Sequence, residues 1–166
     1  MPTTPWTQLP TEQARLLNPA FLGLLVAECC RGYSSVRAEG MPYALAFLAS
    51  PIVLHKKTRE LLPRAVSTSM AAWLTENPIA EVGFSERAKT LVSSTRGALI
   101  YATNAKMIVL RDGHWVGARR PKGYVPFEKG ASDEVQKCLK KAAFLGKWFA
   151  SASDSTTTLA LWGVTP

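Results

Sequence analysis

Apolar residues recur at helical spacing along most of the chain, which indicates a mainly α-helical protein. The first helix is expected to begin at Asn18 and Pro19, because an N-cap amide followed by proline at the first helical position favours a helix start. The wide apolar stripe that follows makes this helix a candidate for the centre of the fold. Its members keep helical spacing until Gly40 ends the run: Leu22, Leu25, Val26, Cys29, Tyr33 and Val36.

A nearly continuous apolar run occupies residues 41–54 and contains Pro51. Proline interrupts a helix, so the run predicts two buried helical pieces joined at a kink. The polar stretch 55–59, which begins with His55 and carries three cations, is then expected to lead out to solvent. Its charges could contact phosphate groups, but a solvated face is the alternative.

Two further helices are predicted before residue 105. Ser67 or Thr68 is the expected N-cap of a short helix, and Asn77 ends it because the residue before a proline resists the helical conformation. Ser85 is expected to open a longer helix, whose apolar residues fit a 3.6-residue period as far as Asn104.

The period changes to that of a β-hairpin after this helix. Two β-prone runs, 107–111 and 114–118, flank the pair Asp112-Gly113, which favours the tight turn of a hairpin. Short helices, a longer helix and a hairpin follow one another in the order of a winged helix-turn-helix domain. We therefore predict a mainly α protein with a small β-hairpin, in which a winged helix-turn-helix-like core carries extra N- and C-terminal helices.

The last long helix is expected to run from Ser132 to about Ala150, and a short helix or strand follows it. Residues 1–9 show no periodicity and predict a flexible arm, in which Trp6 is a possible anchor on a partner. Residues 10–166 are expected to form a single domain.

Composition agrees with one soluble globular domain: the 166 residues are 47% hydrophobic and 19% charged. A disordered tail and a collagen-like repeat are excluded on these grounds. The formal net charge of +8 suggests an anionic partner, and most of the excess lies in the second half of the chain. Three cysteines and the lack of an apolar run long enough to span a membrane predict a cytoplasmic protein without a membrane partner.

Signatures of catalysis are missing from the sequence. The two histidines, His55 and His114, have no cysteine or carboxylate at metal-ligand spacing, and the chain has no glycine-rich phosphate-binding motif. We therefore expect no metal, no cofactor and no enzymatic activity.

The hairpin and the strand that leaves it are candidates for nucleic-acid binding, because guanidinium groups on a thin wing can contact phosphates. A solvated wing, whose charges only maintain solubility, is the alternative. The candidate residues are Arg111, His114, Arg119, Arg120 and Lys122.

One face of the last long helix combines aromatic and basic residues opposite the apolar stripe. Large aromatic side chains surrounded by charge mark contact surfaces, so this face is expected to meet a partner protein. The alternative is that it packs against the N-terminal part of its own chain. The residues of this face are Lys137, Lys140, Lys141, Phe144, Lys147 and Trp148.

Six motifs occur in the order found in a known family. The chain resembles the small middle components of three-component ABC-ATPase conflict systems, a group that includes the middle subunit of Lamassu-type antiphage defence. The motifs that carry the resemblance are Asn18-Pro19-Ala20; the run from Pro42 to Leu54 with His55-Lys56-x-Thr58-Arg59 and Leu62-Pro63; Ala72-Trp73 with Glu76-Asn77-Pro78; Gly83-Phe84-x-Glu86-Arg87-Ala88; the stretch from Lys141 to Ala150; and Gly163-Val164-x-Pro166.

This resemblance implies an accessory subunit without catalytic residues. Such a subunit assembles with an SMC/Rad50-like ABC ATPase and an effector, commonly a nuclease, and helps to keep the effector inactive until DNA is sensed. DNA would be contacted through the complex. The rival hypothesis is a stand-alone winged-helix DNA-binding regulator, and a hydrolase or nuclease is the third.

Overall fold

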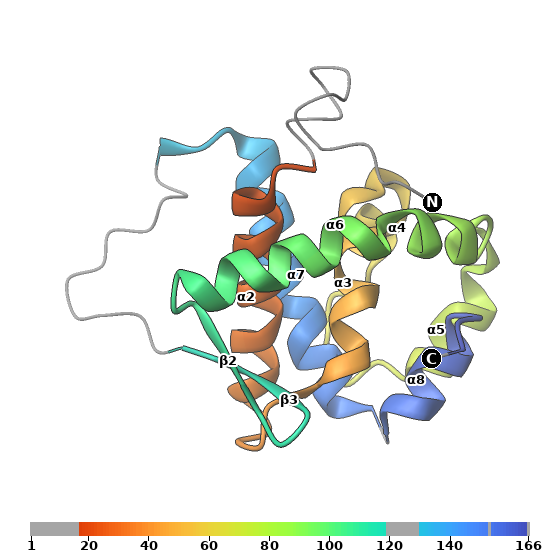
Figure 1. Ribbon diagram of the computed structural model, residues 1–166. Coiled ribbons are helices and arrows are strands. Elements are labelled where there is room, and N and C mark those ends of the chain that lie inside the picture. Colours follow the sequence, from red (N-terminus) through yellow and green to blue (C-terminus); the bar gives the residue numbers. More distant parts are fainter. Residues whose placement is uncertain (1–16, 119–129, 153, 166) are drawn as a thin grey trace.

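The computed structural model describes residues 17–118, 130–152 and 154–165 (Figure 1). Within these ranges the protein is mainly α-helical with one small antiparallel sheet, which confirms the predicted fold class. The winged-helix arrangement and the domain boundaries stay predictions. In chain order the elements are α2 (Pro19–Ser34), β1 (Met41–Pro42), the 3-10 helix η2 (Tyr43–Leu45), α3 (Ala46–Leu54), α4 (Lys56–Leu61), α5 (Met70–Glu76), the 3-10 helix η3 (Pro78–Ala80), α6 (Phe84–Asn104), β2 (Ile108–Arg111), β3 (His114–Gly117), α7 (Asp133–Ser151) and α8 (Ser155–Leu161).

Helix α2 packs against both α7 and α6, and α6 crosses in front of it in Figure 1. A Cβ atom at Gly23 would lie 3.3 Å from the carbonyl oxygen of Ala98 on α6, and one at Gly32 would lie 2.1 Å from that of Ala143 on α7. The two glycines are nine residues apart, which corresponds to a rotation of about 900°, or two and a half turns. They therefore face opposite sides of α2. Helices α6 and α7 therefore pack on opposite sides of the central helix.

The predicted start of α2 is confirmed, but its predicted end is not. The side chain of Asn18 accepts a hydrogen bond from the Ala20 N–H at 2.8 Å. The helix ends at Ser34, and Val36, expected in the apolar stripe, is 54% exposed. Arg37 instead holds the turn against the end of α7, because its Nε donates to the Ala150 carbonyl at 2.8 Å.

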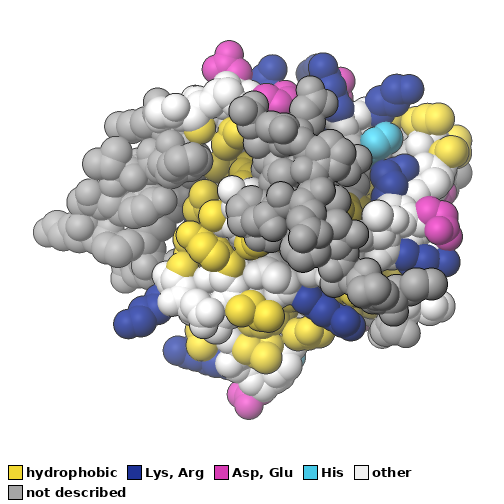
Figure 2. Space-filling view, turned by 45° about the horizontal axis from the view of Figure 1, so that its top comes forward, with side chains coloured by type: hydrophobic (Ala, Val, Ile, Leu, Met, Phe, Trp, Pro, Cys, Tyr) yellow, Lys and Arg dark blue, Asp and Glu magenta, His cyan; other side chains and the backbone are white. Residues whose placement is uncertain are grey.

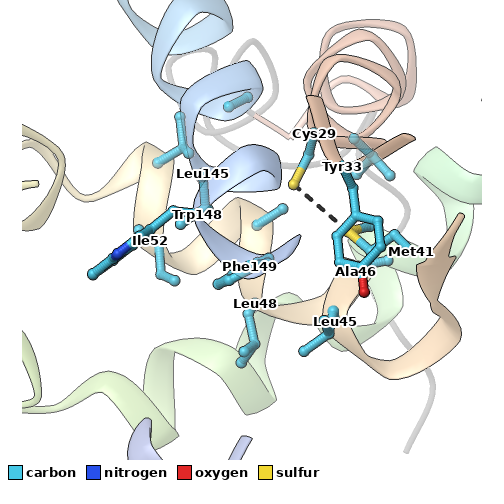
Figure 3. Packing of buried hydrophobic residues seen from close by; sticks show 14 of the residues in the cluster. Cys29, Tyr33, Met41, Leu45, Ala46, Leu48, Ile52, Leu145, Trp148 and Phe149 are labelled. Carbon is cyan, nitrogen blue, oxygen red and sulfur yellow. Dashed lines mark hydrogen bonds between the residues drawn. The ribbon is translucent and has the colours of Figure 1, made fainter. Parts of the chain in front are cut away.

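The core fills the space between α2, α3 and α7 (Figure 3). Cys29 on α2 lies with its sulfur 3.8 Å from that of Met41, and Leu145 and Phe149 reach the same cluster from α7. A Cβ atom at Gly146 would lie 1.9 Å from the carbonyl oxygen of Cys29. Only a glycine allows α7 to approach α2 this closely.

The apolar run 41–54 does not form two helical pieces joined at Pro51. Its first residues form β1 and η2, and Pro51 lies inside α3. Strand β1 pairs with β3, where Met41 stands opposite Trp115. A strand of two residues is too short for its alternating pattern to be seen in a continuous apolar run.

The polar stretch 55–59 forms the first turn of α4 rather than an exit to solvent. His55 is the N-cap, and its ring nitrogen accepts a hydrogen bond from the Thr58 N–H at 3.4 Å. Thr58 and Arg59 are buried. Lys56 and Lys57 are exposed, as a solvated face requires.

Helices α5 and α6 lie close to their predicted positions. Ser69, rather than Ser67 or Thr68, caps α5, and Asn77 ends it as expected. Helix α6 begins one residue before Ser85.

The predicted hairpin is confirmed. Asp112 and Gly113 adopt positive φ angles of 48° and 77°, and the strands on either side pair in antiparallel register, with Leu110 opposite Trp115. The sheet has the strand order β1-β3-β2.

The C-terminal helices also agree with the sequence. Ser132 caps α7, and the segment after it forms a helix, α8, rather than a strand. Asp154 caps α8 by accepting a hydrogen bond from the Thr157 N–H at 2.8 Å.

Candidate partner-binding site

The outer face of α7 displays most of the residues that the sequence predicts for partner binding. Lys137, Lys140 and Lys147 are exposed, while Lys141 and Phe144 are half-buried. Helical spacing brings Lys137, Lys140, Lys141 and Phe144 next to one another. Trp6, predicted as an anchor on the N-terminal arm, lies outside the described residues.

Trp148 is not part of this exposed face, so its expected exposure is wrong and the alternative, packing against an earlier part of the chain, holds for it. Its side chain is 1% exposed and lies within the buried cluster (Figure 3). The indole Nε1 donates a hydrogen bond to the Thr68 carbonyl at 2.8 Å. The ring packs edge to face against Trp73, with 5.3 Å between the two ring centroids. The segment around α5 covers this end of α7, a contact that periodicity within one helix cannot reveal.

A groove of about 400 Å³ has two walls: one is formed by α4 and the residues that follow it, and the other by α7. Phe144 is the aromatic residue among those that line it, and Arg64 lines it together with three α7 lysines. The residues that line it are Arg59, Glu60, Pro63, Arg64, Lys137, Lys140, Lys141 and Phe144. We call this feature the cationic groove.

Most of the cations in the cationic groove have no acidic partner among residues 17–118, 130–152 and 154–165. Arg59 is the exception: it is 3% exposed, donates to the Val53 carbonyl at 2.7 Å, and forms an ion pair with Glu134. Among the described residues, no ion pair involves Arg64 or the lysines of α7. These cations therefore produce a positive potential that an acidic partner would neutralise.

Lys141 and Phe144 form a half-buried pair in the groove. The Lys141 Nζ lies 5.6 Å from the centre of the Phe144 ring, within the range of a cation–π contact. Partial burial lowers the pKa of Lys141 from its ordinary value. A carboxylate brought to this position would replace the favourable interaction with water that the ammonium group has partly lost.

The structure does not test the predicted nucleic-acid site as a whole. Arg111 is exposed, while His114 is half-buried with its Nδ1 2.8 Å from the Asp112 carbonyl oxygen. Arg119, Arg120 and Lys122 lie outside the described residues.

A second surface, which sequence reasoning missed, lies on α6 and the hairpin. Ile100 is 63% exposed, Leu110 46% and Tyr43 43%. In Figure 2, hydrophobic side chains gather between Lys and Arg side chains over the lower part of the view. The signal was an apolar residue, Ile100, beyond the apolar stripe of α6.

Within the described ranges there is neither a candidate metal site nor a candidate membrane-spanning helix. No cluster of three or more His, Cys, Asp or Glu side chains within them is arranged to hold a metal ion. No helix in the described part of the chain has both the length and the apolar character to cross a membrane.

A comparison with protein families gives one result that covers nearly the whole chain. The family model described as ABC-three component (ABC-3C) system Middle Component 3 matches residues 6–166. No curated protein and no solved structure matches the chain.

Proposed function

Because the chain belongs to the family of Middle Component 3 of ABC-three component systems, we propose that it is a non-catalytic adaptor of a bacterial antiphage complex. In this proposal it joins an SMC/Rad50-like ABC ATPase to an effector, often a nuclease, as in Lamassu-type systems. The effector stays inactive until the ATPase senses DNA.

The observation that carries this proposal is the cationic groove. Phe144 is half-buried, and most of the cations around it form no ion pair in the part of the chain that the structure describes. Such a surface suits an acidic protein segment that also places an apolar side chain on Phe144. The lysines supply charge complementarity, and the aromatic ring supplies apolar contact area. This combination favours a protein partner over a free anion.

Regulation by such an adaptor needs different contacts in two states. If the adaptor binds the ATPase and effector together in the resting state, a DNA-bound ATPase must contact it less favourably for the effector to be released. An adaptor of this kind requires no reactive group of its own.

Co-purification tests the role of the cationic groove. The chain is co-expressed with the proteins encoded by its neighbouring genes, either as wild type or with Lys137→Glu and Lys140→Glu. The matched control carries Lys57→Glu and Lys89→Glu, which changes the net charge equally at exposed positions outside the groove. We expect the groove variant to lose a subunit that the wild type and the control retain.

Two results would contradict the proposal. Equal loss in the groove and control variants would mean that only total charge matters. A wild-type chain that retains neither subunit but binds a DNA duplex tightly, with a steep loss of affinity in salt, would favour the stand-alone regulator.

A further inference from the structure

A second groove lies on the opposite side of the molecule from α7. It has a volume of about 470 Å³ and runs between the C-terminal half of α6 and the hairpin with Tyr43. Since Gly23 and Gly32 direct α6 and α7 to opposite sides of α2, a partner in this groove would not compete for space with one in the cationic groove.

The shape of this groove fits a helix. Arg96, Ile100 and Asn104 follow one another at intervals of four residues on its α6 wall. Such a row forms a ridge on the helix surface, and a second helix packs beside a ridge of this kind. Leu110 and Tyr43 contribute apolar surface on the opposite wall.

The polar groups of the groove indicate the chemistry of its occupant. Among the described residues that line the groove, Arg96 alone is charged. Its side chain is exposed and forms no ion pair in the described part of the chain. Trp115 is 5% exposed, and its indole N–H has no hydrogen-bond acceptor among the described residues. Because that N–H is itself buried, the evidence for the occupant comes from Arg96, whose charge favours a segment that carries a carboxylate.

We infer that the groove between α6 and the hairpin binds an amphipathic helix of a partner subunit. The apolar residues of this partner helix contact Ile100, Leu110 and Tyr43, and one carboxylate of the helix pairs with Arg96. This inference rests on the proposed function and adds a second contact on the side opposite the cationic groove. The chain then bridges two proteins through α2, the helix on which both faces pack.

The test compares two residues of nearly equal exposure. Ile100 is 63% exposed in the groove, and Val82 is 64% exposed in the turn before α6. Ile100→Asp and Val82→Asp are each co-expressed with the ATPase and effector subunits. We expect Ile100→Asp to weaken retention of one subunit by about thirtyfold, as for a hot spot of an interface, and Val82→Asp to leave it unchanged.

Arg96 provides the second measurement. Arg96→Glu should weaken retention of the same subunit, and exchanging the paired acidic residue of its helix for lysine should restore it. Photo-crosslinking from position 100, followed by mass spectrometry, identifies that helix. Circular dichroism establishes that each variant is folded.

Each outcome decides between the two proposals. If the wild type and Val82→Asp retain both subunits and Ile100→Asp does so equally, this inference fails while the proposed function stands. If the wild type retains neither subunit, both fail. Loss of binding to a short DNA duplex in Ile100→Asp, with the subunits still retained, assigns the groove to nucleic acid and overturns the inference.

Discussion

Replacing Trp148 with alanine should remove a large fraction of the protein's free energy of unfolding, whereas replacing Phe144 with alanine should remove much less. Trp148 is 1% exposed, while Phe144, one turn earlier on α7, is half-buried. The pair therefore separates a structural residue from a surface residue on one helix.

The magnitude follows from the contacts of Trp148. A buried tryptophan removes about 150–250 Å² from water, and truncating it to alanine costs about 3–5 kcal/mol. This total includes the edge-to-face contact with Trp73, worth about 1 kcal/mol, and the hydrogen bond to Thr68, worth a similar amount. Against a typical stability of about 5–15 kcal/mol, the loss is severe.

Urea denaturation followed by circular dichroism measures these differences. We expect Trp148→Ala to lose about 4 kcal/mol and Trp148→Phe, which keeps an aromatic ring but not the N–H, to lose about 1–2 kcal/mol. Phe144→Ala should lose about 1–2 kcal/mol and remain folded. A Trp148→Ala protein within about 1 kcal/mol of wild type would refute the burial on which the description of α7 depends.

Three further predictions concern the core and the cationic groove. Gly146→Ala should prevent α7 from packing on α2, because its Cβ would lie 1.9 Å from the Cys29 carbonyl oxygen. Gly97→Ala, whose Cβ meets nothing within 4 Å, should instead stabilise the protein by about 0.5–1 kcal/mol. Thermal melts compare the two variants, and similar melting temperatures would contradict the close packing. Burial raises the pKa of Cys30 from 9.0 to about 12, so the folded state keeps a proton that the unfolded state loses as the pH rises. From pH 8 to pH 10 the wild type should therefore lose about 1.4 kcal/mol more stability than Cys30→Ala, and equal decreases in urea titrations would refute this. Retention of the subunit bound at the cationic groove should decrease as salt rises from about 0.1 M to about 1 M, since the screening length falls from about 10 Å to about 3 Å; salt-independent retention on a biosensor surface would exclude a charge-based contact.

Local signals in the sequence account for most of the elements. Asn18 with Pro19 starts α2, Asp112 with Gly113 turns the hairpin, and Ser132 caps α7, because each depends on contacts within a few residues. The positions of α5 and α6 were also close to those predicted. The family, too, was identified from motifs that are local in the sequence.

Two of the errors arose where distant segments meet. Strand β1 exists because Met41 pairs with Trp115, more than seventy residues away, and Trp148 is buried because α5 packs over it. The groove at α6 likewise combines Ile100 with Tyr43 and Leu110 from other elements. A helical wheel shows which residues share a face, but it does not show what covers that face.

The amino-acid sequence by itself therefore determined the helices, the hairpin, the excess of positive charge and the lysine-rich face of α7. Tertiary structure alone decided which aromatic residues of that face remain accessible, and that α6 and α7 present separate grooves on opposite sides of α2. The physical reason is range: capping, turn formation and periodicity act between near neighbours in the chain, whereas burial depends on every segment that packs nearby.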